Sequence, residues 1–542
     1  MEENKMKNHK KASVLAGLAV VGSLLSVSTG ALAEETTTEQ SVQESDFSEH
    51  MDISVAFWDV EKYLTSTPDD EALKFMENKF NVTFVPQNMT WDDYDQKLQL
   101  WAASDSLPDI FMGAKRTTAT FAKWANEGLL KEIPSDLSKY PNLEKFLDSP
   151  QLETCKVDGK IYCLFRRSYT EQAGTSRDTT IAYRWDLAQK AGVTKEPETW
   201  EEFDDMIQKI IEMDPEEKGI KGMTAKSYGM LRQAFVPYTS PLAAHGGVSF
   251  YWVDNGEGEY VPAYFEGETL GSKILPTWKL LRHLYEDGTI DKDLAVITST
   301  QATESFLQGN NAAILSDGGA DNIWSIGQNW EEVYGRDFFD DVKILGLMED
   351  ENGNPTYPIT PDSAWSETYI SSHVDDEKLD RILAIYDFLT TEEGYIFGNC
   401  GIEGKTYGRT ADGEITYDGY NDGGVPGDTY QSLNLFSKLA MWARGAEWYN
   451  ELPSTVPEQI EEADAKRVNL AKTLPIPEYN YDCTSKYLEL GLDFTITLED
   501  DILNIMTGTE DVEKMWNDRI EKYKSDGLED VIAQINEAVK AE

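Results

Sequence analysis

The chain has 542 residues and a formal net charge of −50, from 48 Lys and Arg against 98 Asp and Glu. Nucleic acids and anionic membrane surfaces attract positive charge, so this balance argues against both as partners. A chain of this length exceeds what one hydrophobic core usually organises and suits two or three domains.

The N-terminus has the features of an export signal. Lysines precede an apolar stretch from Val14 to Val27, and Ala31-Leu32-Ala33 forms an A-x-A cleavage site. The apolar stretch is shorter than the ~20 residues that a spanning helix needs. We therefore expect a signal peptide over residues 1–33 and a disordered spacer, rich in Glu, Thr and Ser, over residues 34–50.

The region after the spacer predicts strands and helices in alternation. The expected strands are residues 53–57, 82–85 and 107–112. Thr67 and Thr90 stand where hydroxyls would cap the two intervening helices. A β-α-β-α-β order implies parallel strands with right-handed crossovers, whose ligands bind beyond the carboxyl ends of the strands. Trp58 and Asp59 stand at one such end.

A hairpin and a helix start follow. Asp158-Gly159 between apolar residues predicts a two-residue turn with positive φ at both positions. Thr199 and Glu202 have capping-box spacing. The apolar residues after them fall on one helix face, namely Phe203, Met206, Ile207, Ile210 and Ile211. An ordinary α/β domain of unrelated function would explain this pattern equally well.

Four cysteines occur, namely Cys155, Cys163, Cys400 and Cys483, which allow two disulfides in three pairings. A two-residue turn pairs Cys155 with Tyr162 and puts Cys163 on the opposite face, so a disulfide there would need a bulge or an odd-length loop. Buried free thiols are the alternative. Cys and His spacings typical of zinc are absent, and five His make a His-built metal site unexpected.

These motifs resemble those of the family 1 extracellular solute-binding proteins, the sugar-binding components of ABC importers. The similarity is greatest to a long-chain branch that includes alginate-oligosaccharide-binding proteins, and it covers roughly residues 51–542. The matching segments are Lys97 to Ile110, Asp158 to Tyr162, Tyr183 to Asp186, Pro197 to Phe203, Glu304 to Ile314 and Gly401 to Tyr407.

The resemblance implies an α/β, periplasmic-binding-protein-like fold with two lobes joined by a hinge, each with a central β-sheet flanked by helices. It assigns residues 51–168 and 312–372 to the first lobe. Residues 169–311 and 373–542, with the C-terminal helices, are assigned to the second.

The resemblance also implies a function: capture of an oligosaccharide between two closing lobes and its delivery to the permease subunits of a membrane transporter. We expect a monomer that is not an enzyme and uses no cofactor. The protein would be extracellular and held at the cell surface through the transporter, because the lipid-modified cysteine of many relatives is missing near Ala33.

In relatives, a loop corresponding to residues 214–222 often binds structural calcium through oxygen ligands. Here Lys218 places a cation at one ligand position and Gly222 supplies no side-chain oxygen. We therefore expect no metal in this loop.

The expected sugar site combines aromatic rings, which stack on the apolar faces of sugars, with polar groups that bind hydroxyls. The candidate ring platforms are Trp58, Trp252, Trp324, Trp365 and Tyr407, and the candidate polar contacts are Asp59, Asp105, Arg166 and Tyr183. A large aromatic residue is more often part of a core. Arg166-Arg167 could hold an acidic sugar, but we favour a structural ion pair.

Two other functions fit the sequence less well. A secreted glycoside hydrolase would also be acidic and Trp-rich, but its two catalytic carboxylates must stand at set distances, which an abundance of acids does not predict. An oligopeptide-binding protein of similar length would recognise peptide backbone in place of sugar rings.

Overall fold

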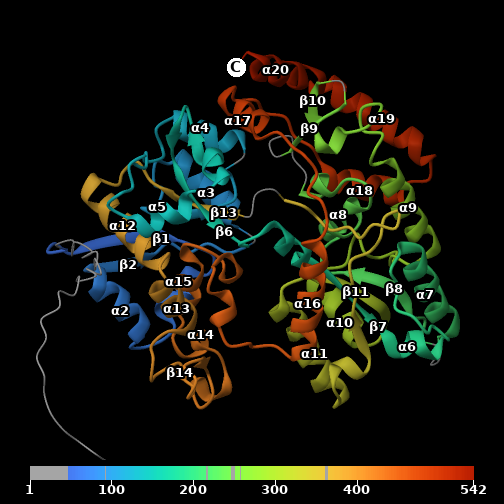
Figure 1. Ribbon diagram of the computed structural model, residues 1–542, viewed down its shortest axis with the longest axis horizontal. Helices are drawn as coiled ribbons and strands as arrows, with labels where there is room; N and C mark the ends of the chain where they lie inside the picture. The colour runs from blue at the N-terminus through green and yellow to red at the C-terminus, as the bar shows by residue number, and fades with distance from the viewer. Residues whose placement is uncertain are drawn as a thin grey trace, which may run out of the picture. The chain divides into compact units, whose positions relative to one another are not determined.

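The computed structural model describes residues 47–91, 93–116, 118–214, 218–245, 251–256, 258–360 and 364–541. The expected signal peptide and most of the expected spacer lie outside them. Two β-sheets organise the described chain, and we call the parts built around them the first and the second lobe (Figure 1). No helix in the described ranges is both long and apolar enough to cross a membrane.

The first lobe contains a five-stranded sheet with the order β2-β1-β3-β13-β6. Its strands are β1 (Met51–Ala56), β2 (Val82–Pro86), β3 (Ile110–Gly113), β6 (Cys163–Arg167) and β13 (Ala364–Ile370). Strand β1 pairs in parallel with β2 and β3, with Val55 opposite Ile110, which confirms the predicted β-α-β-α-β start. Strand β13 is antiparallel to both of its neighbours, β3 and β6.

The helices of the first lobe come from two separate parts of the chain. They are α1 (Val60–Thr65), α2 (Glu71–Phe80), α3 (Tyr94–Ala103), α4 (Ala119–Asn126), α5 (Pro141–Leu147), α12 (Asp376–Leu389), α13 (Glu392–Cys400), α14 (Pro426–Thr429) and α15 (Leu433–Leu439). The predicted caps of α2 and α3 are wrong. Asp70 caps α2 by accepting from Leu73 N at 2.9 Å, and α3 begins after Asp93, whose carboxylate accepts from Thr90 N at 2.7 Å.

The second lobe contains a four-stranded sheet with the order β12-β7-β11-β8. Its strands are β7 (Thr179–Arg184), β8 (Lys221–Ala225), β11 (Asn311–Asp317) and β12 (Val342–Ile344), and β9 (Trp252–Asp254) forms a separate pair with β10 (Tyr260–Pro262). The helices are α6 (Trp185–Lys190), α7 (Trp200–Met213), α8 (Leu231–Phe235), α9 (Leu275–Asp287), α10 (Ser299–Leu307), α11 (Ala320–Tyr334), α16 (Glu458–Ala471), α17 (Tyr481–Glu489), α18 (Leu498–Thr507), α19 (Val512–Ser525) and α20 (Leu528–Lys540).

Helix α7 follows its local sequence signals closely. The Thr199 hydroxyl accepts from Glu202 N at 3.2 Å, as the capping-box spacing predicts. The Glu202 carboxylate reaches one residue further back and accepts from Glu198 N at 2.8 Å. The apolar residues Phe203, Met206, Ile207 and Ile210 are buried, and Ile211 is half-buried, so the predicted stripe faces the core.

Four short strands form two small hairpins outside the two main sheets. Strands β4 (Lys156–Val157) and β5 (Lys160–Ile161) join through Asp158 and Gly159, which have φ of 51° and 73° and confirm the predicted turn. A second small hairpin pairs β14 (Gly408–Arg409) with β15 (Ile415–Thr416).

All four cysteines are free and buried, which confirms the alternative of buried free thiols over disulfides.

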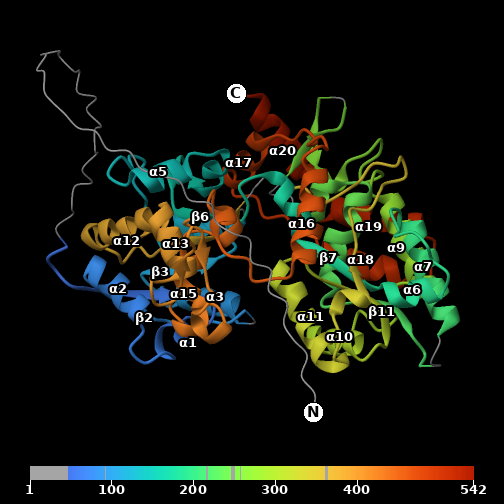
Figure 2. The same cartoon turned by 60° about the horizontal axis from the view of Figure 1, so that its bottom comes forward.

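The chain passes between the two lobes three times, and two expected boundaries differ from the structure. Residues 312–344, assigned to the first lobe, contain β11 and β12 of the second sheet. Residues 376–439, assigned to the second lobe, contain helices whose apolar residues join the first core, which Figures 1 and 2 show in orange around the first sheet. Strand β11 is buried along six of its seven residues and is central in its sheet, a placement set by packing that no local motif encodes.

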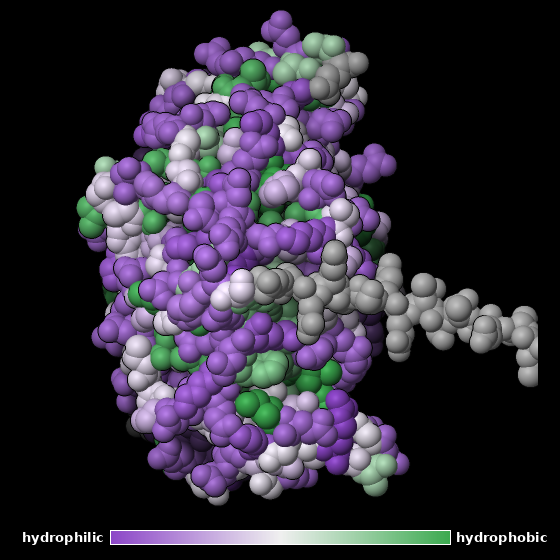
Figure 3. All heavy atoms as spheres, turned by 90° about the vertical axis from the view of Figure 1, so that its left-hand side faces the viewer, coloured by the Kyte–Doolittle hydropathy of each residue, from purple (hydrophilic) through white to green (hydrophobic). Residues whose placement is uncertain are grey.

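Each lobe has its own core of buried apolar residues, and a third, smaller cluster includes Phe306, Trp330 and Ile460 of the second lobe. The face of the molecule drawn in Figure 3 is mainly hydrophilic with scattered apolar residues. This distribution fits a chain whose acids stand at the surface.

Candidate functional site

A cavity of about 1360 Å³ is lined by residues of both lobes and of all three connections between them. The first connection, between β6 and β7, contributes Ser168, Tyr169 and Arg177. The second, between β12 and β13, contributes Thr360, and the third, between α15 and α16, contributes Trp442. A cavity of this size is large for a single sugar ring and suits an oligomer.

Aromatic rings form one wall of the cavity. The indole of Trp365 is 45% exposed and lines the cavity together with Trp442, their centroids being 5.4 Å apart and their planes 38° from parallel. Trp365 also stacks on Trp58 at 5.7 Å and on Trp91 at 5.9 Å. Trp58 is 1% exposed, so it supports the exposed ring from beneath. Trp324 of α11 lines the cavity from the second lobe.

An irregularity in β13 turns Trp365 toward the cavity. The pairing of β13 with β6 shifts register between Ala364 and Glu367, which is the geometry of a β-bulge. Ser366 has a φ of 65°, a left-handed backbone that residues with a Cβ seldom adopt. The Trp365 amide donates to Ser168 Oγ at 3.2 Å, and Trp365 O accepts from Trp442 Nε1 at 3.1 Å.

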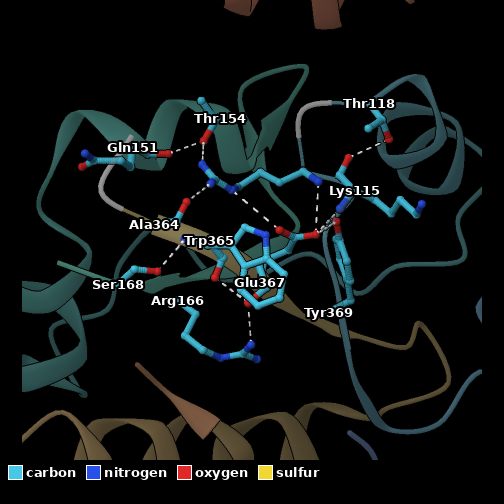
Figure 4. A network of polar contacts seen from close by, with 12 residues as sticks. Lys115, Thr118, Gln151, Thr154, Arg166, Ser168, Ala364, Trp365, Glu367 and Tyr369 are labelled. Atoms are coloured by element: carbon cyan, nitrogen blue, oxygen red, sulfur yellow. Dashed lines mark hydrogen bonds and ion pairs between the residues drawn. The ribbon is translucent and has the colours of Figure 1, made fainter. Parts of the chain in front are cut away.

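Glu367 fixes this bulge from within the lobe. Its side chain is buried and accepts from Lys115 N at 2.5 Å, from Arg116 N at 3.1 Å and from the Tyr369 hydroxyl, as Figure 4 shows. The Arg116 guanidinium lies 3.8 Å from the same carboxylate and donates to Ala364 O at 3.1 Å. Burial raises the pKa of Glu367, and Arg116 opposes that rise. The network therefore anchors both ends of the bulge.

Arg166 lies beneath the aromatic wall. It is 1% exposed and donates to Ser366 Oγ at 2.6 Å, and its guanidinium lies 5.3 to 5.9 Å from the ring centroids of Phe57, Trp58 and Trp442. Burial lowers its pKa to about 10. No carboxylate in the described ranges is within ion-pair distance of Arg166, so the structural ion pair that we favoured is wrong. Cation–π contacts and the Ser366 hydroxyl take its place.

A polar cluster joins two connections to α16. The Asp464 carboxylate lies 3.1 Å from Arg177 Nε and 3.2 Å from Arg444 Nη2, so one acid holds a guanidinium from the first connection and another from the third. Nearby, the Tyr169 hydroxyl donates to Asp178 at 2.6 Å. Burial raises the pKa of Asp178 to about 6.

The structure brings some of the nine predicted site residues together. Trp324 and Trp365 line the cavity, and Trp58 and Arg166 lie directly behind its wall. Asp59 precedes α1 and does not line the cavity.

The other four predicted residues lie elsewhere. Tyr183 and Trp252 are buried in the second core, and the Tyr183 hydroxyl donates to Glu196 at 3.2 Å. Tyr407 is buried in the first core. The Asp105 carboxylate is exposed and lies 3.1 Å from His373 Nε2. Their role in binding has no support from this geometry.

Sequence reasoning missed Trp442, Arg177, Arg444 and Lys438, all of which line the cavity. Trp442 and Arg444 stand in a short stretch rich in Trp and Arg, a signal that the sequence offered. This stretch indicates a binding site only once it is known to form the third connection between the lobes, which its local sequence does not reveal.

Two groups of residues were compared with metal-binding sites, namely the loop that begins at Asp214 and a cluster around His283. In the expected calcium loop, the Asp214 carboxylate accepts from the amides of Lys218 and Gly219 at 3.1 and 2.6 Å, and residues 215–217 lie outside the described ranges. Among the described residues, Asp204, His283 and Asp287 place three potential ligand atoms within 4.8 Å of one another. His283 lies 3.3 Å from Asp204 and 3.6 Å from Asp287, so contacts between the imidazole and the two carboxylates account for the cluster.

Comparisons with known proteins identify a family and two similar proteins. A model described as bacterial extracellular solute-binding protein matches residues 72–396. Lipoprotein LipO of Bacillus subtilis is 26% identical over 358 residues, and the match spans 65% of this chain and 66% of LipO, just under two thirds. The polygalacturonan/rhamnogalacturonan-binding protein YtcQ of the same organism is 23% identical over 524 residues, 94% of this chain and 96% of YtcQ.

The fold has solved counterparts. The ABC-transporter substrate-binding protein FusA of S. pneumoniae, solved with kestose, superposes with a TM-score of 0.63 at 16% identity, covering 91% of this chain and 99% of FusA. At this identity the likeness concerns the fold, and it confirms the predicted two-lobed, periplasmic-binding-protein-like architecture.

Proposed function

The chain belongs to the bacterial extracellular solute-binding proteins, and we propose that it is the oligosaccharide-binding component of an ABC importer. The observation that carries the proposal is the exposed indole of Trp365, backed by Trp58 and flanked by Trp442 in the wall of a large cavity. Sugar rings present apolar C–H faces that stack on such platforms, while their hydroxyls need the polar groups that line the rest of the cavity.

Two similar proteins support a saccharide. The name of YtcQ describes binding of polygalacturonan and rhamnogalacturonan, and FusA was solved with kestose. An oligomer would bind across the cavity between rings of the first lobe and Trp324 of the second.

Capture requires no bond to be made or broken. A ligand that contacts both lobes gains more contacts when they close, and that difference in affinity shifts the population toward the closed form. The connections that bend in this motion carry Tyr169, Arg177 and Arg444, which line the cavity, so ligand contact and hinge are adjacent. We further propose that the closed, monomeric protein is recognised outside the cell by a membrane permease.

A thermal-shift and calorimetry screen of the purified protein against oligosaccharides and peptides tests this proposal. A binding oligosaccharide should raise the melting temperature and be recovered uncleaved. Replacement of Trp365 by Ala should weaken binding about tenfold or more, because burying a large apolar side chain against the ligand contributes on the order of 1.5–3 kcal/mol. The matched control is Trp185→Ala, a half-buried ring of α6 that does not line the cavity and does not contact the aromatic wall. Binding of peptides alone would contradict the proposal, and cleavage of the sugar would indicate a hydrolase.

A further inference from the structure

Lys438 is a cation of the cavity wall whose charge the described protein leaves uncompensated. It lies near the end of α15 and lines the cavity. In the ranges that the structure describes, no carboxylate oxygen lies within 4.0 Å of its ammonium and no acceptor forms a hydrogen bond with it. Its contact is with the ring of Tyr63, whose centroid is 5.8 Å from Nζ.

Two acids act on this charge without forming an ion pair with it. Asp59 from the first lobe and Asp321 from the second both favour the charged form of Lys438. Burial acts in the opposite direction and outweighs them, so the pKa of Lys438 is lowered. A half-buried ammonium without a close partner is unfavourable in the unliganded protein and becomes favourable when an anion occupies the cavity beside it.

Lys438 is also close in sequence to the ring platform. Trp442 stands four positions after Lys438, and its indole donates to Trp365 O at 3.1 Å. The first-lobe wall thus contributes two indoles for the apolar face of a sugar and one ammonium for a negative group. Among neutral and acidic sugars, a uronate offers both features on one ring.

The cavity lining is less acidic in proportion than the chain. Of the described residues, five Lys and Arg and six Asp and Glu line it, whereas the chain as a whole has 48 and 98. Four of the five cations are arginines, namely Arg116, Arg177, Arg232 and Arg444, and each has a carboxylate within 4.0 Å. Of the cations in the described lining, Lys438 is therefore the one without a carboxylate within 4.0 Å, and it is available to bind a carboxylate of the ligand.

We propose that the ligand is an acidic, uronate-containing oligosaccharide and that Lys438 binds one of its carboxylates. This inference rests on the proposed oligosaccharide function and deepens it by naming the ligand class. It makes Lys438 a specificity-determining residue, because the interaction distinguishes a free carboxylate from the same group masked as an ester.

Isothermal titration calorimetry with matched ligands tests the inference. The probes are oligosaccharides of galacturonate, glucuronate and mannuronate, the methyl ester of each, and neutral oligosaccharides. The proteins are the wild type, Lys438→Met, Lys438→Arg and the control Lys279→Met, which replaces an exposed lysine of α9. Melting temperatures of all four establish that the variants are folded.

We expect the wild type to bind an acidic oligosaccharide more tightly than its ester. Lys438→Met should lose about tenfold or more of the affinity for the acid and little for the ester, while Lys438→Arg and Lys279→Met retain the preference. Equal losses for acid and ester would overturn the inference and assign Lys438 a role in lobe closure. Binding of neutral oligosaccharides alone would also overturn it while leaving the proposed function intact. A wild type that binds no saccharide would refute both.

Discussion

Ser366 shows how one residue positions the aromatic wall of the cavity. Its left-handed backbone, with φ of 65°, is unfavourable for a residue with a Cβ by roughly 1 kcal/mol. The bond from Arg166 to the Ser366 hydroxyl offsets this cost, since a hydrogen bond from a charged donor contributes about 1.5–3 kcal/mol. The hydrogen bond thus stabilises the bulge that exposes Trp365.

Asp178 should give the protein a pH-dependent stability. Its pKa is about 6 in the folded protein, against an ordinary value of 3.8. Between these values the folded state binds more protons than the unfolded state, so the contribution of Asp178 to folding becomes less favourable as pH rises, by roughly 3 kcal/mol in total. Urea unfolding of the wild type and of Asp178→Asn should show this as a difference in free energy that changes between about pH 4 and pH 6.

The Asn variant retains an acceptor for Tyr169 and cannot titrate, so it removes the general effect of the many other acids from the comparison. A difference between wild type and variant that stays constant over this pH range would contradict the raised pKa.

At the scale of elements, helix α7 depends on Thr199, the residue that caps its N-terminus. Thr199→Ala removes the acceptor for Glu202 N and should lower the free energy of unfolding by about 1 kcal/mol. Thr199→Ser keeps a capping hydroxyl and should lose less than half of that. Chemical denaturation of the three proteins measures both values, and equal losses in Ala and Ser would show that the cap does not stabilise α7.

Elements with a local chemical signal were predictable from the sequence. The Asp158-Gly159 turn needs positive φ, and the stripe after Thr199 needs one buried face, so both follow from neighbouring residues alone. The bulge at Ser366 and the burial of Arg166 depend on strands almost 200 positions apart in the chain, β6 and β13. The same holds for Lys438, whose importance arises only where three connections meet around a cavity.

At the scale of the whole molecule, the net charge of −50 should make stability depend on salt. Repulsion among the excess acids opposes the compact state, and raising NaCl from about 10 mM to about 150 mM shortens the Debye length from roughly 30 Å to roughly 8 Å. The melting temperature should therefore rise over this range by several degrees. Sucrose at matched osmolality serves as the control, and a fall in melting temperature with salt would show that surface ion pairs outweigh the repulsion.

The order of strands in the first sheet has a consequence for how the chain is assembled during synthesis. Strand β13 lies between β3 and β6, which precede it by roughly 250 and roughly 200 residues, whereas every strand of the second sheet is complete by Ile344. Synthesis begins at the N-terminus, so all strands of the second sheet are available before β13 completes the first sheet. Until the chain has formed the second sheet and returned, β3 has a free edge and β6 has no neighbour in the first sheet.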